Sequence, residues 1–191
     1  MHVKIAGAPI SWGVSEVPGW GFQMSPDRVL AEMNSLGLTA TEFGPEGFLP
    51  TDPNQKAAFL AGHKIRAIGG FYPILLHDPT NDPIPAVTAE LDSYEAAGAE
   101  VLVLAASTGI DGYNDARPAL TEAQWKIMFE NLFKVAEIAK QRGVKAVVHP
   151  HVGTLIETRA DIEQVLAGTT IGFCLDTGHM AIGGQDPVEF A

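Results

Sequence analysis

The chain has 191 residues, of which 46% are hydrophobic, and this is enough for one substantial core, so we expect a single domain over residues 1–191. Its formal net charge of −11, from 12 Lys and Arg against 23 Asp and Glu, argues against nucleic acid or an anionic membrane surface as a partner, because such binders rely on basic side chains. Since the sequence shows neither a signal-peptide pattern nor an apolar run of about 18 residues, we expect a cytoplasmic protein with a small-molecule substrate.

Short apolar or β-branched runs alternate along the chain with longer helical patterns. The runs predict strands over residues 3–8, 39–43, 66–72, 101–105, 145–148 and 171–175. The patterns between them predict helices over 26–36, 53–62, 85–98, from 121 to near 143, and 158–166, with a further helix starting at 187. Ser25-Pro26 and Thr121-Glu122-Ala123-Gln124 have the composition of helix N-termini, and Gly37 has that of a helix C-terminus.

Strict alternation of strands and helices predicts a parallel sheet covered by helices. The segment after the first predicted strand, Gly7-Ala8-Pro9-Ile10-Ser11-Trp12-Gly13, lacks the GxGxxG pattern of a doubly wound nucleotide-binding fold. Unusual polar and aromatic residues instead follow the ends of the predicted strands, where barrel enzymes carry their active sites. We therefore predict an α/β fold, a (β/α)8 TIM barrel of which this chain contains the first six strands.

The strongest local candidate for a site is Leu175-Asp176-Thr177-Gly178-His179, directly after the sixth predicted strand. A carboxylate that leaves the end of a buried strand needs a partner such as a cation, which makes Asp176 a candidate metal ligand. The alternative is that Asp176 only caps the following turn and that His179 lies on the surface.

A second candidate, Val148-His149-Pro150-His151, follows the fifth predicted strand. Two histidines separated by one residue can direct both imidazoles into one cavity, with Pro150 fixing the backbone between them. Imidazole and carboxylate ligands suit a divalent metal such as Mn, Co or Zn, and adjacent strands would bring His149 and His151 to the same point as Asp176. The alternative is a pair of hydrogen-bonded polar residues that hold the loop.

Three further residues are weaker candidates. Glu42 ends the second predicted strand, where a buried carboxylate can bind a substrate hydroxyl or act as an acid or base; the alternative is a salt bridge with Lys4 or Arg66. Trp12 can stack on a sugar ring or simply pack in a loop. His77 follows the third predicted strand and can contact substrate or be exposed to solvent.

Four segments together resemble the inosose dehydratases, which belong with the sugar phosphate isomerases and epimerases of the xylose isomerase-like TIM barrel group. The segments are Ala8-Pro9-Ile10-Ser11-Trp12-Gly13, Ala40-Thr41-Glu42-Phe43-Gly44-Pro45, His149-Pro150-His151-Val152-Gly153-Thr154 and Cys174-Leu175-Asp176-Thr177-Gly178-His179. The resemblance extends over essentially the whole chain. It implies a divalent metal at the carboxyl end of the barrel, held by Asp176 and by His149 or His151, with His149 standing where many relatives have a glutamate.

The resemblance also implies the roles of the remaining candidates. His179 matches a residue that contacts substrate or a second metal, so it is a candidate for catalysis and for substrate binding. Glu42 and Trp12 would belong to the pocket of a sugar or inositol-derived substrate. From the residues alone we add Glu42 as a candidate catalytic group and His77 as a candidate substrate contact. The implied reaction is proton abstraction next to a ketone, with the metal stabilising the enediolate-like charge.

The resemblance predicts a metal-dependent lyase that expels a β-hydroxyl after this proton abstraction. One alternative is a sugar isomerase or epimerase, which returns the proton to the substrate. Another is a non-catalytic sugar-binding relative or an inactive fragment. An abasic-site endonuclease, which uses a related barrel with three zinc ions, is disfavoured by the negative charge of the chain.

Six strands of a barrel leave open edges, because the counterparts of strands seven and eight and of their metal ligands do not occur in this sequence. Open parallel edges expose unpaired backbone groups and promote association. We therefore expect either that the chain is part of a longer polypeptide or that it forms a homo-oligomer.

Overall fold

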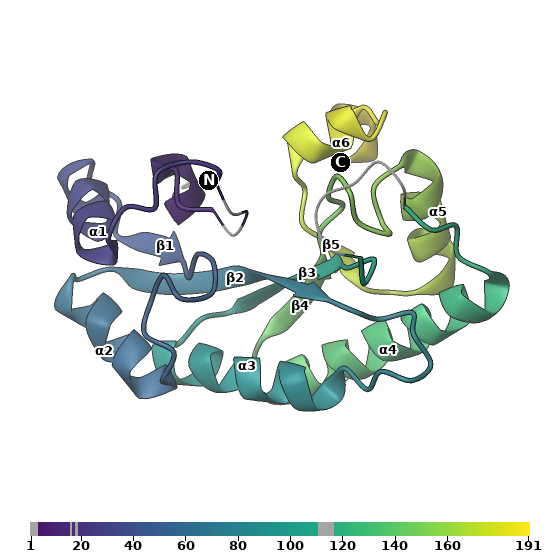
Figure 1. Ribbon diagram of the computed structural model, residues 1–191, viewed down its shortest axis with the longest axis horizontal. Helices are drawn as coiled ribbons and strands as arrows, with labels where there is room; N and C mark the ends of the chain where they lie inside the picture. Colours follow the sequence, from purple (N-terminus) through teal and green to yellow (C-terminus); the bar gives the residue numbers. More distant parts are fainter. Residues whose placement is uncertain (1–3, 16, 18, 111–116) are drawn as a thin grey trace. The chain divides into compact units, whose positions relative to one another are not determined.

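Five strands form one parallel sheet whose order, β1-β2-β3-β4-β5, follows the sequence (Figure 1). The structure is a computed structural model, and it describes residues 4–15, 17, 19–110 and 117–191. The strands are β1 (Ala40–Glu42), β2 (Arg66–Ile74), β3 (Val101–Ala106), β4 (Lys145–Val148) and β5 (Gly172–Phe173). β1 pairs in parallel with β2, and β4 pairs in parallel with β5. Each connection between parallel neighbours is a crossover, and in the described residues these crossovers contain helices.

The helices begin where the sequence provides caps. They are the 3-10 helix η1 (Pro9–Trp12) and the α-helices α1 (Pro26–Ser35), α2 (Pro53–Gly62), α3 (Ile84–Ala97), α4 (Glu122–Gln141), α5 (Arg159–Gly168), α6 (Thr177–Ile182) and α7 (Pro187–Phe190). Thr121 and Gln124 form a reciprocal capping box at the start of α4, and Thr158 and Asp161 form one at the start of α5. Gly37, just after α1, has a positive φ of 79°, as expected of a residue that ends a helix.

The first predicted strand, residues 3–8, is wrong for the residues that the structure describes. Residue 3 lies outside them, and from Lys4 to Ala8 only Gly7 pairs, in a single parallel bridge with Thr41. The Gly7 amide donates to the carbonyl of Ala40, and the Glu42 amide donates to the carbonyl of Gly7. Pro9 then starts η1 and cannot donate a ladder hydrogen bond, which ends the pairing after one bridge. The described residues therefore contain five strands rather than the predicted six.

The chain divides into two compact units, Met1–Phe71 with Ala89–Val101 and Tyr72–Thr88 with Leu102–Ala191. In the first unit, α1 buries Val29, Leu30 and Met33, and the ring of Phe43 meets that of Tyr94 edge to face, with 5.1 Å between centroids. Tyr94 also donates its hydroxyl proton to the carbonyl of Gly70, so its polar end is satisfied in the core of the unit.

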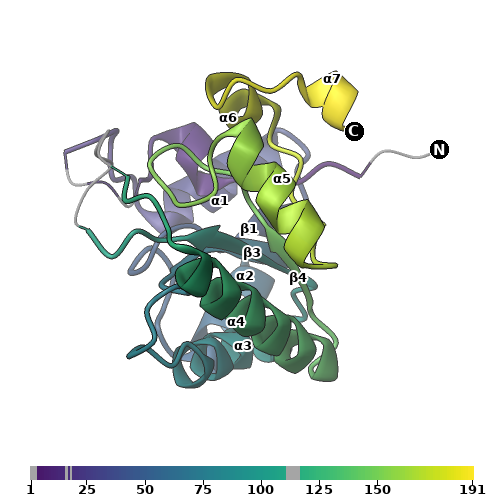
Figure 2. The same ribbon diagram turned by 90° about the vertical axis from the view of Figure 1, so that its right-hand side faces the viewer.

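In the second unit, the long helix α4 packs on β4 and contacts α5 (Figure 2). Met128, Leu132 and Val135 of α4 are fully buried, and this apolar stripe fixes the helix against the sheet. The short helices α6 and α7 contact each other after β5. In the part of the chain that the structure describes, no helix combines the length and the apolar character needed to cross a membrane.

Candidate metal centre at the carboxyl ends of β4 and β5

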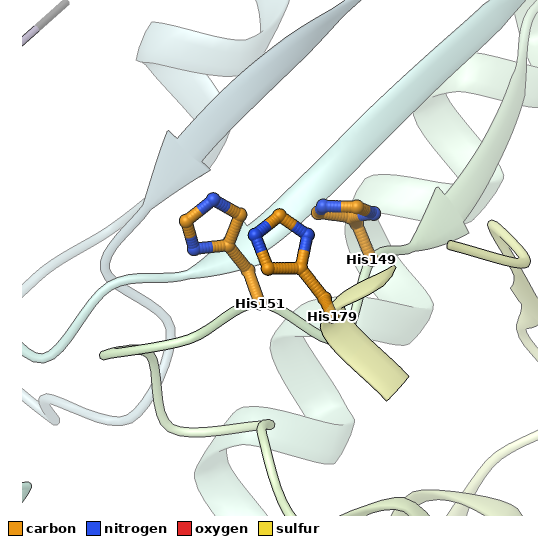
Figure 3. A group of neighbouring side chains, drawn as sticks. All are labelled: His149, His151 and His179. Atoms are coloured by element: carbon orange, nitrogen blue, oxygen red, sulfur yellow. The ribbon is translucent and has the colours of Figure 1, made fainter. Parts of the chain in front are cut away.

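Three imidazoles come together in the second unit, where β4 and β5 end. Ring nitrogens of His149, His151 and His179, one from each residue, all lie within 4.8 Å of one another. The ring centroids of His151 and His179 are 4.0 Å apart, and the ring of His149 lies 5.2 Å from that of His179 (Figure 3). Segments 28 residues apart in the chain, from 151 to 179, thus contribute to one cluster of side chains. We call His149, His151 and His179 together the imidazole group.

His149 is placed by the backbone of the sheet. Its amide donates to the carbonyl of Leu104 on β3 over 2.8 Å, which extends the pairing of β4 by one residue. The residue is only 7% exposed. Burial lowers the pKa of His149 to about 4, and the neighbouring His151 and His179 lower it as well, against the opposing charge of Asp176. At neutral pH this ring is uncharged, which is the state that a metal ligand requires.

His151 is oriented by its own loop. Its Nδ1 lies 2.7 Å from the carbonyl oxygen of Val152, and since a carbonyl only accepts, Nδ1 is the donor. In the neutral ring the lone pair is then on Nε2. A hydrogen bond from one ring nitrogen that fixes the tautomer is typical of histidines that bind a metal through the other nitrogen. Holding the loop and presenting a ligand are therefore compatible roles for His151.

Asp176 uses its two carboxylate oxygens differently. Oδ1 accepts a hydrogen bond of 2.8 Å from the His179 amide and so caps α6, while Oδ2 lies 3.1 Å from Nδ1 of His179 and 4.0 Å from Nε2 of His149. Burial by itself raises the pKa of Asp176, but the hydrogen bond from His179 and the charges of the two histidines outweigh burial and lower it. Asp176 is thus both the cap that the alternative interpretation required and a carboxylate directed at the imidazoles.

His179 lies in α6, a helix that the sequence patterns did not predict. Gly178 disfavours a helix by propensity, but Asp176 at the N-cap position favours it, because its carboxylate accepts from the amide of His179. The side chain of His179 is 25% exposed, so it is half-buried and not fully on the surface. The signal that could have located it is the i, i+3 spacing of an N-cap aspartate and a histidine on the first helical turn.

The donor set is compatible with a divalent transition metal. Ligands at 2.0–2.1 Å in a tetrahedral zinc site lie roughly 3.3 Å from one another, so nitrogens within 4.8 Å need only small side-chain movements to share an ion. Three imidazoles and one carboxylate are ligands that such metals accept. His149, His151, His179 and Asp176 are the residues that could hold it.

Two predicted site residues belong to the first unit. Glu42 ends β1, and burial raises the pKa of its carboxyl group. No cation pairs with Glu42 among the residues that the structure describes, and Arg66, one predicted partner, instead lies 4.0 Å from Glu100. Trp12 ends η1 and donates its indole N–H to Glu32 over 2.9 Å. Glu42 is therefore a half-buried carboxylate without the predicted salt bridge, and Trp12 is anchored to α1.

His77 follows β2 in the second unit and is buried, with 8% of its surface exposed, so the prediction of solvent exposure is wrong. Its Nδ1 has no hydrogen-bond partner among the residues that the structure describes, and burial lowers the pKa of the ring. His77 is not one of the three residues whose ring nitrogens converge. Its predicted contact with substrate remains a prediction.

A match to a protein-family model identifies the family of this chain. The xylose isomerase-like TIM barrel model matches residues 30–191. The chain belongs to this family. The β1–β5 sheet with its helical crossovers is the corresponding part of the family's α/β fold, and the imidazole group lies at the carboxyl ends of two of its strands, where barrel enzymes of this kind place their sites.

Several relatives in this family are similar over nearly the whole chain. An inosose dehydratase of Geobacillus kaustophilus (strain HTA426) is 29% identical over 198 residues, and one of Clostridium perfringens (strain 13 / Type A) is 28% identical over 197. These alignments cover 97% and 98% of this chain but 64% and 66% of the relatives, so the chain spans about two thirds of their length.

A solved structure has the same fold at lower identity. The IOLI protein with a binding zinc atom superimposes with a TM-score of 0.71 at 15% identity, covering 99% of this chain and 69% of that protein. At this identity the likeness shows the fold alone.

Proposed function

We propose that the protein is a metal-dependent lyase of the inosose dehydratase type, which removes a proton next to the ketone of a cyclic polyol and expels a β-hydroxyl. The observation that carries the proposal is the convergence of three imidazoles and Asp176 at the ends of β4 and β5. The inosose dehydratases at 28–29% identity support the reaction class. The chain spans 64–66% of the length of those relatives, so the activity is itself part of the proposal.

The metal would be held by His149, His151, His179 and Asp176. Mn²⁺, Co²⁺ and Zn²⁺ all accept imidazole and carboxylate ligands, and zinc is the metal bound by the IOLI protein of the same fold. When bound, the metal supplies a Lewis acid for the negative charge that develops on the substrate oxygen.

At neutral pH, His149 and Asp176 are already in the protonation states that metal binding requires. His149 is uncharged because its pKa is lowered to about 4, and Asp176 is ionised because its pKa is lowered as well. The carboxylate offsets part of the charge of a divalent cation, while the hydrogen bond from Nδ1 of His151 to Val152 keeps the other ring nitrogen available as a donor of electrons.

Glu42 is the proposed acid or base. A carboxyl group whose pKa is raised by burial lies closer to the operating pH, and proton transfer is most efficient in that range. Trp12 and His77 are the proposed substrate contacts. Trp12 would act through its ring face, and His77 through a buried Nδ1 that no described residue hydrogen-bonds.

The proposed function can be tested by measuring what happens to the α-proton of the substrate. The metal-free protein is loaded with Co²⁺ or Mn²⁺ and incubated in D₂O with an inosose and, separately, with simple ketoses. A lyase gives an ultraviolet-absorbing dione from the inosose, and His151→Gln should abolish it. His63→Gln is the control, because His63 pairs with the exposed carboxylate of Asp27 and lies outside the imidazole group.

The other outcomes separate the alternatives. Exchange of the α-proton for deuterium with return to a ketose or its epimer, and no absorbing product, would replace the lyase by an isomerase or epimerase. Metal binding with saturable sugar binding but no exchange would instead identify a non-catalytic binding protein. The absence of metal binding would contradict both catalytic proposals.

A further inference from the structure

Glu157 contacts the loop that carries His149 and His151. Its Oε2 accepts a hydrogen bond of 2.7 Å from the amide of Gly153, two residues after His151. Gly153 has a positive φ of 76°, a conformation that glycine adopts without strain and that turns its N–H toward the carboxylate. The Glu157 side chain is only 19% exposed, so this is a partly buried, charge-assisted bond.

The backbone of Glu157 contacts the other ligand-bearing segment. Its carbonyl oxygen accepts a hydrogen bond of 3.3 Å from Nε2 of Gln185, which is 8% exposed. Gly183, which ends α6, approaches the same oxygen so closely that a Cβ there would lie 2.2 Å from it. The Gly183 amide in turn donates to the carbonyl of His179. One residue thus connects the segment of His151 with the segment of His179.

Arg117 and Asp161 hold Glu157 in place. Nε of Arg117 lies 3.4 Å from Oε2 of Glu157, and its Nη1 donates to Oδ2 of Asp161 over 2.8 Å and to the carbonyl of Thr154 over 3.1 Å. Asp161 also accepts from the Glu157 amide. The hydroxyl of Thr154 donates to the carbonyl of His151 over 2.8 Å, so the network reaches the backbone of a proposed ligand.

We propose that Glu157, fixed by Arg117, is a positioning residue that sets the distance between the two ligand-bearing segments and thereby the geometry of the metal centre. The inference rests on the proposed function, since it assumes that the imidazole group binds a metal. Glu157 is not itself a ligand, because its carboxylate oxygen is engaged by Gly153 and Arg117. Outer residues of this kind orient the ligands, and their loss typically weakens metal binding about 10- to 100-fold.

The chain provides a matched pair of variants and a matched control. Glu157→Gln keeps an oxygen that can accept from the Gly153 amide, whereas Glu157→Ala removes it. Glu163 on α5 also pairs with an arginine, Arg159, at 2.9 Å, but both side chains are 62% exposed. The other described ion pair of Arg159 is with Glu189 on α7, outside the ligand-bearing segments. Glu163→Ala therefore removes a carboxylate–arginine pair without touching the proposed network.

The readouts are the Co²⁺ dissociation constant, the visible absorption spectrum of bound Co²⁺ and the melting temperature of the metal-free protein. We expect Glu157→Ala to weaken Co²⁺ binding about 10- to 100-fold and to change the spectrum, and Glu157→Gln to stay within about threefold of the original protein. Glu163→Ala should change neither quantity. Rescue by glutamine would distinguish positioning from charge alone.

The contrary result is a Glu157→Ala protein with a lowered melting temperature but with unchanged Co²⁺ affinity and spectrum, which would make Glu157 a purely structural residue. If Glu157→Ala does not fold, Gln185→Ala decides, with a weaker affinity and an altered spectrum expected and unchanged values overturning the proposal. Asp176→Ala is measured in parallel. If that variant also binds Co²⁺ normally, the metal centre itself is wrong, and the failure lies in the proposed function.

Discussion

Glu42 and Asp176 are both carboxylates at the carboxyl ends of strands, one in each unit, yet their environments give them opposite properties. Burial raises the pKa of Glu42, and no cation or donor in the described residues compensates for it. Burial also acts to raise the pKa of Asp176, but the amide and ring of His179 and the ring of His149 reverse the effect. Strand position therefore locates polar groups, while the partners around each carboxylate determine its charge.

This difference suggests a division of roles. An ionised carboxylate surrounded by imidazoles suits cation binding, and a carboxyl group with a raised pKa suits proton transfer. The same logic separates acid and base roles in enzymes with two carboxylates in different environments. Each of the following predictions changes a residue of one unit and leaves the carboxylate of the other unit intact.

The largest effect is expected for Asp176→Ala, which should lose measurable binding of Co²⁺ or Zn²⁺ in isothermal titration calorimetry. The variant removes both the carboxylate near the imidazoles and the cap of α6. Asp186→Ala is the matched control, because Asp186 caps α7 through the amides of Val188 and Glu189 but contacts no imidazole of the group. Equal affinities of the two variants would show that Asp176 acts only as a helix cap.

A smaller effect is expected for Glu42→Gln in the exchange of the substrate α-proton. Removing a general acid or base typically slows the reaction about 10²- to 10⁴-fold. The metal dissociation constant should not change, because Glu42 is not in the imidazole group. The exchange rate is measured by nuclear magnetic resonance in D₂O, and a variant that exchanges at the original rate would exclude Glu42 from the proton transfer.

Trp12→Ala should raise KM for the substrate by up to about tenfold, since aromatic contacts contribute about 0.5–1.5 kcal/mol. Trp12→Phe keeps a ring face but loses the hydrogen bond to Glu32, so it separates stacking from anchoring. If phenylalanine restores the original KM, the ring face is the contact. If both variants behave as the original protein in steady-state kinetics, Trp12 only packs in its loop.

The smallest effect is the contribution of Glu42 to stability. Its folded pKa lies above the ordinary value of 4.5, so the folded state holds the proton more tightly and stability falls as the pH rises through this window. Glu42→Gln should therefore raise the melting temperature at about pH 8 and leave it nearly unchanged at about pH 4. Thermal unfolding of the metal-free proteins checks the sign of this effect. A Glu42→Gln protein that melts below the original protein at about pH 8 would mean that the fold stabilises the ionised form of Glu42.

Most helices and strands could be predicted because their signals are local. The capping box of Thr121 and Gln124 fixed the start of α4, and the predicted residues 145–148 are those of β4. The prediction of a strand at residues 3–8 is too long because apolar character does not show whether a ladder partner is present. Among the described residues 4–8, only Gly7 has one. Helix α6 was missed because Gly178 lowers helix propensity, whereas the cap by Asp176 outweighs it.

The candidate site was predicted in part. The two histidines after β4 and Asp176 followed from strand ends, which are a sequence feature, but the inclusion of His179 in the imidazole group depends on the helix that was missed. The network of Arg117, Glu157, Asp161 and Gln185 has no local pattern in the sequence that could predict it. Arg117 and Asp161, for example, are 44 residues apart in the chain. Such contacts form only when distant segments are brought together by the fold.

The most direct test of the central claim is an anomalous difference map from crystals of the protein grown with zinc. We predict one strong peak bonded to a nitrogen of each of His149, His151 and His179 and to Asp176, with zinc–nitrogen distances of about 2.0–2.1 Å. No peak at these residues in crystals that hold zinc elsewhere would contradict the account, because the imidazoles would then be a polar cluster without a metal.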